Sequence, residues 1–488
     1  MEQPHDPQLR LLVSLNIMPQ RPRSTTEKSL PTHKHLVGEE SNKTILFLNW
    51  ISRCFVCDTD TYSDNVSVAA SFTGNSCTLY IATSRGMANQ ADYDYSKQFL
   101  AVCRDVFLSQ DRVLAAGKEV LQEDAGESVR KILDCILDRV WTRFLRKVAA
   151  LKREFLAEGG FERLDGLLQA WITWRAEKGK PGERSRDVIT IAEHETGGDT
   201  HAMLRGVFDV ILNEDSPTQS REERFEYFVR VTTRCIGLFY SNFFRDGCRR
   251  RFPEAEMSFF FCRTVRRLWR VQIYHSGAVT FATTWMKHCR AIFNVKEPSF
   301  SGVWVGHTMP KVVDFPVSIR ETLLDILHRR QVNFSDKDLD RYLEGKYMRV
   351  DSTCREGQPL TLHPHPEIQM LHYLHWSGIS VFKNAVGSSK PVCEVCMRYK
   401  MLYEERSNCP ENLVFTPRFP GVEKEHFERD WMLPDSSSGN QVQRNVVDTV
   451  LNSVVSEFTI GAENRFAWCF LDARHPDLLD PASYFPLY

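Results

Sequence analysis

The fold class follows from residues 360–396, which read LTLHPHPEIQMLHYLHWSGISVFKNAVGSSKPVCEVC. A short extended segment, Leu360–Leu362, leads into a predicted helix over Pro366–Trp376, with Pro at the first helical position, where its missing N–H has no intrahelical partner to lose. A strand is expected over Ile379–Val386, then a turn and a second helix over Val392–Glu405. Strands that alternate with helices predict an α/β unit.

The same alternation continues towards the C-terminus, and an antiparallel pair of strands lies far upstream. Alternating apolar residues interrupted by Gly74-Asn75 predict a β-hairpin over Val66–Ala82. The further expected elements are a helix over Thr44–Cys57, a strand over Leu413–Thr416, a helix over Gln441–Val455 and a strand over Arg465–Leu471.

A helical pattern dominates the middle of the chain, from Tyr95 to about His288. Within Glu127–Leu156 the apolar residues recur every three or four positions with Arg and Lys between them, which predicts a long amphipathic helix. Further helices are expected over Thr200–Leu212, Ser220–Arg245, Glu256–Met286, Ser318–Arg329 and Asp336–Glu344.

The composition is typical of a globular protein. The 488 residues carry 62 Lys and Arg against 63 Asp and Glu, which argues against a nucleic-acid-wrapping polycation, and their number predicts two or three domains. No apolar run reaches the roughly 18 residues of a membrane helix, and the apolar patch Leu11–Met18 runs into Pro19 rather than a cleavage site. We therefore expect an intracellular protein, cytoplasmic or nuclear, whose 14 Cys are thiols or metal ligands.

The spacing of His, Glu and Cys predicts a zinc site. The triplet HPE at residues 365–367 is followed, after 25 intervening residues, by a Cys pair at Cys393 and Cys396. Two Cys at i and i+3 at the start of a helix share one face, where the helix dipole favours the metal-binding thiolate. With His365 as third ligand, a fourth tetrahedral position remains for water, and Glu367 is spaced to lie beside it. Zinc-dependent nucleobase deaminases divide the work in this way.

Neighbouring residues offer alternatives for this assignment. His363 also precedes Glu367, and His372 follows it, but His372 is expected more than a turn inside its helix and away from the Cys pair. The upstream pair Cys54 and Cys57 has no evident His partner and is expected to be core thiols. A second H-x-E triplet, at residues 426–428, has no Cys pair after it.

These segments resemble the OTT-like deaminases of fungi and bacteria, a family within the cytidine deaminase-like superfamily. Its members show H-[AP]-E-[IM]-Q-L-L, then G-x-S-K-x-x-C-x-x-C, then W-x-x-P. Residues 387–396 and 431–434 match the last two patterns, and residues 365–371 match the first except at Met370, where the pattern has Leu. The resemblance implies an α-β-α three-layer fold, bound Zn²⁺, and the roles given above for the ligands and Glu367. Glu394 departs from the pattern, since many relatives carry an aromatic or apolar residue there.

The superfamily fold implied by this resemblance needs a β-hairpin before the H-x-E helix, and residues 66–83 provide the best one. We therefore expect a split deaminase core in which a large helical insertion or accompanying domain separates the hairpin from the zinc motifs. The expected units are a mobile N-terminal tail at 1–43, the first helix and hairpin at 44–90, a mainly helical domain at 91–350, the deaminase core at 351–475 and a C-terminal tail at 476–488.

The expected function is hydrolytic deamination of a nucleobase in a nucleotide or nucleic acid, with water activated by zinc as nucleophile and Glu367 as proton shuttle. Lys390 is a candidate for a substrate phosphate or for holding its turn, and Trp431 for stacking on a base or for the core. The basic, aromatic stretch Arg245–Arg270 fits either single-stranded nucleic acid or an amphipathic helix.

Two alternatives to this zinc-dependent deaminase stay open. One is a non-enzymatic interaction module stabilised by zinc, in which a residue such as His363 or Cys409 closes the fourth position. The other is a deaminase-fold toxin or defence effector, which shares the chemistry and differs in its target. The sequence does not identify a protein partner, and no membrane is expected to take part.

Overall fold

The structure is a computed structural model that combines a central mixed sheet, a smaller sheet and many helices. It describes residues 6–17, 40–57, 64–116, 120–157, 159–178, 197–212, 220–244, 255–285, 298–306, 308–344, 356–407, 413–415, 430–434, 437 and 439–474. No helix in these ranges is both long and apolar enough to span a bilayer.

The described strands form a five-stranded sheet in the order β3-β2-β1-β6-β7. Its strands are β1 (Val66–Thr73), β2 (Ser76–Thr83), β3 (Ser299–Val305), β6 (Ala385–Ser388) and β7 (Val414–Phe415). The predicted hairpin is confirmed, since β1 pairs antiparallel with β2 along its whole length and Gly74 takes a positive φ of 56° in the turn. Strand β6 pairs with the free side of β1, so the hairpin lies in the sheet that leads to the Cys pair.

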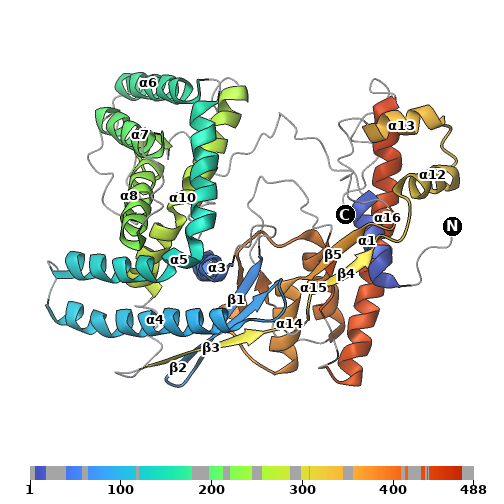
Figure 1. Cartoon of the computed structure of the whole chain (residues 1–488), viewed down its shortest axis with the longest axis horizontal. Coiled ribbons are helices and arrows are strands. Elements are labelled where there is room, and N and C mark those ends of the chain that lie inside the picture. The colour runs from blue at the N-terminus through green and yellow to red at the C-terminus, as the bar shows by residue number, and fades with distance from the viewer. Residues whose placement is uncertain are drawn as a thin grey trace.

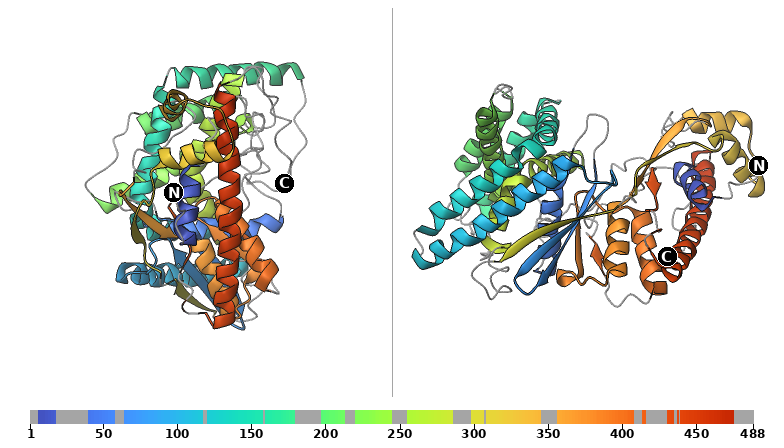
Figure 2. Two further views of the ribbon diagram at one scale, coloured as in Figure 1. Left: turned by 90° about the vertical axis from the view of Figure 1, so that its right-hand side faces the viewer. Right: turned by 60° about the horizontal axis from the view of Figure 1, so that its bottom comes forward.

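The two faces of this sheet belong to two separate cores, because neighbouring strand residues point to opposite sides. Val66, Val68 and Ala70 of β1 pack in one core with helix α3 (Glu40–Phe55). Ala69 lies between them in sequence and packs in the other core with helix α14 (Pro366–Trp376). The arrangement is therefore α/β, with helices on both faces of the sheet (Figure 2).

Helix α3 lies very close to the sheet where it crosses β6. A Cβ atom at Gly387 would lie 2.3 Å from the carbonyl carbon of Leu48 and 2.5 Å from the backbone nitrogen of Asn49. Asn49 Oδ1 accepts a 2.6 Å hydrogen bond from the backbone N–H of Ser388. Glycine is needed at this position because the helix backbone occupies the space of any side chain.

The predicted helical block is confirmed and lies on the α3 side of the sheet (Figure 1). The ring of Phe47 in α3 stacks on that of Trp285 with 3.9 Å between the ring centroids, and the ring centroids of Trp50 and Phe281 lie 5.6 Å apart. The block therefore shares one core with the sheet. The helices are α4 (Gln90–Ala116), α5 (Val120–Leu156), α6 (Gly160–Lys178), α7 (Gly197–Leu212), α8 (Arg221–Phe239), α10 (Ala255–Thr280) and the π-helix η2 (Phe281–Trp285).

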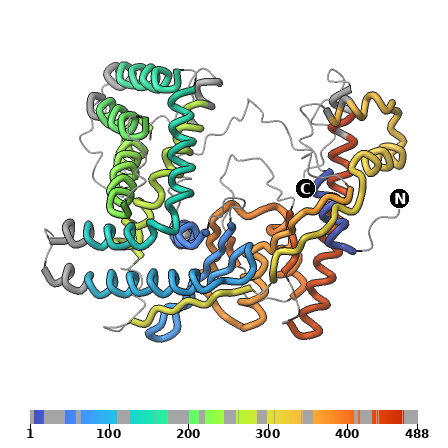
Figure 3. The backbone as a smooth tube through the Cα atoms, viewed as in Figure 1, coloured from blue at the N-terminus to red at the C-terminus, as the bar shows by residue number. Residues whose placement is uncertain are grey.

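A second group of helices packs around the C-terminal helix on the other side of the molecule. Its elements are α1 (Pro7–Ile17), α12 (Ile319–Arg329), α13 (Asp336–Glu344), α15 (Glu394–Ser407) and α16 (Gln441–Arg474), with a three-stranded sheet of β4 (Lys311–Asp314), β5 (Pro359–Pro364) and β8 (Trp431–Met432). The chain reaches this group from the helical block through β3, which joins the main sheet beside β2 (Figure 3). Residues 298–344, predicted as part of the helical domain, thus contribute to both sheets and to the C-terminal helices.

Three predicted elements differ from the structure. Residues 7–17 are not tail but helix α1, which packs on α16, where the hydroxyls of Ser14 and Thr459 lie 2.9 Å apart (Figure 2). The predicted strand Arg465–Leu471 is the end of α16, whose buried residues recur at helical spacing up to Phe470. The strand predicted over Ile379–Val386 shrinks to Ala385–Ser388, because residues 382–384 form a 3₁₀ turn in which Lys383 and Asn384 have positive φ. The predicted C-terminal tail, 476–488, lies outside the described residues.

Candidate metal centre

Three side chains converge where the starts of two helices meet. His365 is the N-cap residue of α14 and directly follows β5, while Cys393 and Cys396 lie at the start of α15. Nδ1 of His365 lies 3.1 Å from Sγ of Cys396 and 3.5 Å from Sγ of Cys393. Tetrahedral zinc, with bonds of about 2.0 Å to nitrogen and 2.3 Å to sulfur, separates such ligand atoms by about 3.5 Å. This buried group can therefore hold a metal ion.

The two thiols are buried, and hydrogen-bond donors point at both sulfur atoms. Burial raises the pKa of Cys396 well above its usual value, and the neighbouring Cys393 raises it further. A divalent cation offsets both effects, since a coordinated thiol gives up its proton. The indole N–H of Trp431 already points at Sγ of Cys396, at 3.3 Å, and the backbone N–H of Cys396 points at Sγ of Cys393, at 3.4 Å. Donors of this kind stabilise thiolates.

Glu367 lies beside the three ligands with its two oxygens in different surroundings. Oε1 accepts hydrogen bonds from the hydroxyl of Ser388, at 2.5 Å, and from Nδ2 of Asn65, at 3.1 Å. Oε2 lies 3.9 Å from Nδ1 of His365 and has no hydrogen-bond partner, although the side chain is only 1% exposed. Burial raises the pKa of this carboxyl, while His365 and Ser388 lower it. One oxygen is thus held by the protein, and the other lies beside the His365, Cys393, Cys396 group.

The structure also places the alternative ligands. Among the described residues, the group of close ligand atoms contains His365 and the two Cys, and His363 and His372 lie outside it. Nε2 of His372 lies 3.0 Å from the hydroxyl of Tyr399, and its ring stacks on Trp376. Cys409 and the second H-x-E triplet, residues 426–428, lie outside the described residues.

The two candidate substrate residues have different surroundings. Lys390 is half-buried in the turn before Cys393, close enough for its charge to lower the pKa of His363, although burial of that imidazole has the larger effect. Trp431 is fully buried and contacts the site through its hydrogen bond to Cys396. The matched W-x-x-P element lies beside the H-x-E motif, because His363 of β5 pairs with Trp431 of β8.

Two other expectations concern the thiols of α3 and the basic, aromatic stretch. Cys54 of α3 is buried in the core that this helix shares with the sheet and the helical block, as expected, and Cys57 is half-buried. Phe260 and Phe261 of α10 are buried, while Arg263 and Arg267 both pair with Glu154 of α5. The described part of the stretch, residues 255–270, is therefore an amphipathic helix of the block, and residues 249–251 lie outside the described residues.

Sequence spacing did not reveal the residues that hold Glu367. Asn65 lies 302 positions before it, and Ser388 precedes the Cys pair without belonging to a metal motif. Gln369, also from the HPEIQ segment, donates from Nε2 to the backbone carbonyl of Thr83 and so ties α14 to the end of β2. These residues become visible only when the hairpin and the zinc motifs are placed in one sheet.

Comparisons with known proteins identify no relative. No family model matches the chain, and no curated protein and no solved structure matches it.

Proposed function

We propose that this protein is a zinc-dependent deaminase that acts on a nucleobase in a nucleotide or nucleic acid. One observation carries the proposal: Oε2 of Glu367 is buried, lacks a hydrogen-bond partner and lies 3.9 Å from a ligand atom of the His365, Cys393, Cys396 group. An unpaired buried carboxylate oxygen is costly, and such costs are concentrated at functional sites.

Zinc, when bound by the three ligands, lowers the pKa of a coordinated water so that the water becomes a nucleophile near pH 7. Glu367 would then act at Oε2, which would accept one proton of the attacking water and pass it to the ring nitrogen of an amidine-like base. The same oxygen would next take the remaining proton from the added hydroxyl group and deliver it to the leaving amine. The carbon–nitrogen bond breaks, ammonia leaves, and the water oxygen remains on the base as a carbonyl.

The proposed finer fold is a cytidine deaminase-like core split by an insertion. The hairpin β1-β2 lies in one sheet with β6, and α14 covers one face of this sheet. The helical block stands in the sequence between the hairpin and the zinc motifs, as such an insertion requires.

The test is to incubate purified protein with pooled nucleosides, nucleotides, RNA and single-stranded DNA and to detect cytosine-to-uracil and adenine-to-hypoxanthine conversion by mass. Glu367→Gln should retain about one zinc per chain and lose turnover by about 10²–10⁴-fold, the usual contribution of a general acid–base group. Its free energy of unfolding should not fall, because a buried charge is removed. Unchanged turnover in a fully metallated Glu367→Gln variant contradicts the mechanism.

Complete burial of the site favours a second candidate function, a non-enzymatic module in which zinc stabilises the fold. His365, Cys393 and Cys396 are each at most 2% exposed, as in closed structural sites. X-ray absorption spectroscopy of the zinc-loaded protein separates the two functions. An enzyme requires one light oxygen ligand besides one imidazole and two sulfurs, whereas a structural site shows a second imidazole or a third sulfur.

A further inference from the structure

The carboxylate of Glu367 is held at one oxygen by donors from two distant segments of the chain. Ser388 of β6 donates its hydroxyl hydrogen to Oε1, and Asn65, just before β1, donates from Nδ2 to the same atom. A carboxylate oxygen offers two lone pairs in the plane of the group, and these donors occupy both. Oε2 is then the only oxygen of Glu367 that is left to exchange a proton.

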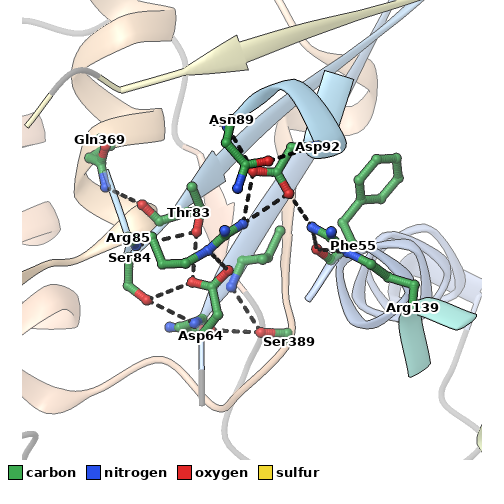
Figure 4. Close-up of polar contacts among 12 residues, drawn as sticks. Phe55, Asp64, Thr83, Ser84, Arg85, Asn89, Asp92, Arg139, Gln369 and Ser389 are labelled. Carbon is green, nitrogen blue, oxygen red and sulfur yellow. Dashed lines mark hydrogen bonds and ion pairs between the residues drawn. The ribbon is translucent and has the colours of Figure 1, made fainter. Parts of the chain in front are cut away.

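The amide of Asn65 has a fixed direction. The hydroxyl of Ser389 donates to its Oδ1 at 2.8 Å, which leaves Nδ2 to serve as the donor to Glu367. The backbone N–H of Asn65 donates to Ser84 Oγ at 2.8 Å, and Ser84 in turn donates to Asp64. Figure 4 shows Asp64, Ser84 and Ser389 close to one another. Because an ionised carboxylate can only accept, Nδ2 of Asn65 must face Glu367 and Oδ1 must face Ser389.

Ser388 is held equally firmly by the sheet. It lies opposite Ser67 in the β1-β6 pair, and its backbone N–H donates to Asn49 of α3. Its hydroxyl lies 2.5 Å from Glu367 Oε1 and 3.5 Å from Asn65 Oδ1, so its hydrogen goes to the carboxylate. Both residues are buried, with Asn65 at 3% and Ser388 at 1% exposure.

We infer that Asn65 and Ser388 are positioning residues that hold Glu367 by Oε1 and thereby aim Oε2 at the metal ligands. The inference rests on the proposed function. If either donor is removed, the carboxylate can rotate about its last torsion and Oε2 can leave the ligand group. The donors hold the carboxylate that transfers the proton, so we expect the loss to appear in kcat.

The activity test compares Asn65→Ala and Ser388→Ala with the wild type, each loaded with zinc. We expect kcat to fall by about 10–100-fold in each, as for other supporting residues of metal sites, with KM changed less than about twofold. Ser388→Thr keeps the hydroxyl and should recover most of the loss. Ser96→Ala is the matched control, because Ser96 is also a buried hydroxyl but bonds to Tyr93 and Trp304 away from the site, and its kcat should be unchanged.

A second measurement needs no turnover. In the cobalt-substituted protein the visible absorption bands report the ligands and their surroundings, so Glu367→Gln should shift them, and Asn65→Ala and Ser388→Ala should shift them in the same direction. Ser96→Ala should not. A wild type without any deaminase activity refutes the proposed function and leaves this result to decide the positioning. Unchanged cobalt bands and unchanged kcat in both variants overturn the inference, and Ser388→Ala alone decides it if Asn65→Ala does not fold.

Discussion

Asp92 joins the helical block to the hairpin, and its replacement by Asn should destabilise the whole chain. The carboxylate is completely buried at the start of α4, where both oxygens accept from the Arg85 guanidinium at 3.0 and 3.1 Å and one also accepts from Arg139 of α5. Asn89 donates its backbone N–H at 2.9 Å (Figure 4). Asp92→Asn keeps the shape of the side chain and removes the charge that both guanidinium groups face.

The expected loss is about 3 kcal/mol. One Asp–Arg pair at about 4 Å is worth about 4 kcal/mol at an effective dielectric constant of about 20. Two pairs are weakened, but the variant no longer pays several kcal/mol to bury a carboxylate. Arg85 keeps Asp64, at 2.9 Å, and Arg139 keeps the carbonyl of Phe55, at 3.1 Å. The loss should therefore lie at the lower end of the range of about 3–5 kcal/mol for breaking a buried pair.

The assay is equilibrium urea unfolding at pH 7 and moderate salt. Asp94→Asn is the control, because it makes the same change two residues later on the exposed side of α4 and should cost less than about 0.5 kcal/mol. The double variant Asp92→Asn with Arg139→Met should lose less than the sum of the single variants, since the two residues share one interaction. A loss below about 1 kcal/mol for Asp92→Asn, or strict additivity with Arg139→Met, refutes this account of the network.

Three further predictions concern single residues around the sheet. Burial lowers the pKa of His372 to about 3, against about 6.5 in the unfolded chain. His372 should therefore leave the free energy of unfolding unchanged above about pH 6.5 and lower it by up to about 1.4 kcal/mol per pH unit as the pH drops from there towards 3. His372→Gln should flatten this slope in urea unfolding. Gly387→Ala should cost about 2–3 kcal/mol in the same assay, because its Cβ would lie 2.3 Å from the backbone of Leu48, and an unchanged midpoint contradicts that contact. Trp431→Phe removes the hydrogen bond to Cys396 and should weaken zinc binding by about tenfold in competition with a chromogenic chelator, whereas equal affinity shows that the indole only fills space.

Local sequence patterns were sufficient for most helices, for the hairpin and for bringing together a His–Cys–Cys group that can hold a metal ion. The helical spacing in Glu127–Leu156 and the turn at Gly74 arise from interactions between residues that are close in sequence. The H-x-E triplet and the Cys pair also lie together within a segment of 32 residues. The compact His365, Cys393, Cys396 group follows directly from helix starts that meet at one end of the sheet.

What sequence reasoning missed depends on long-range packing. Strand β3 lacks a continuous apolar face, because three of its first four residues are exposed, and its parallel pairing with β2 defines it. The end of α16 carries aromatic residues suited to a strand, but α16 is already helical when it reaches them and buries Phe466 and Phe470 against Tyr342 of α13. The short N-terminal helix α1 likewise has little to mark it besides its contact with α16.

Strands β1 and β6 can pair only late in synthesis, because they are far apart in the sequence. Ser67 and Ser388, which face each other in this pair, are 321 residues apart. At about 5–20 residues per second, the ribosome needs roughly 15–65 s to reach β6 after it has made β1. During that interval the nascent hairpin exposes the edge of β1, the edge of β2 until β3 is made, and the apolar face that α14 later covers. Unpaired strand edges promote aggregation. The helical block, made in the meantime, covers only the opposite face, so the α14 face stays open until the last quarter of the protein is made.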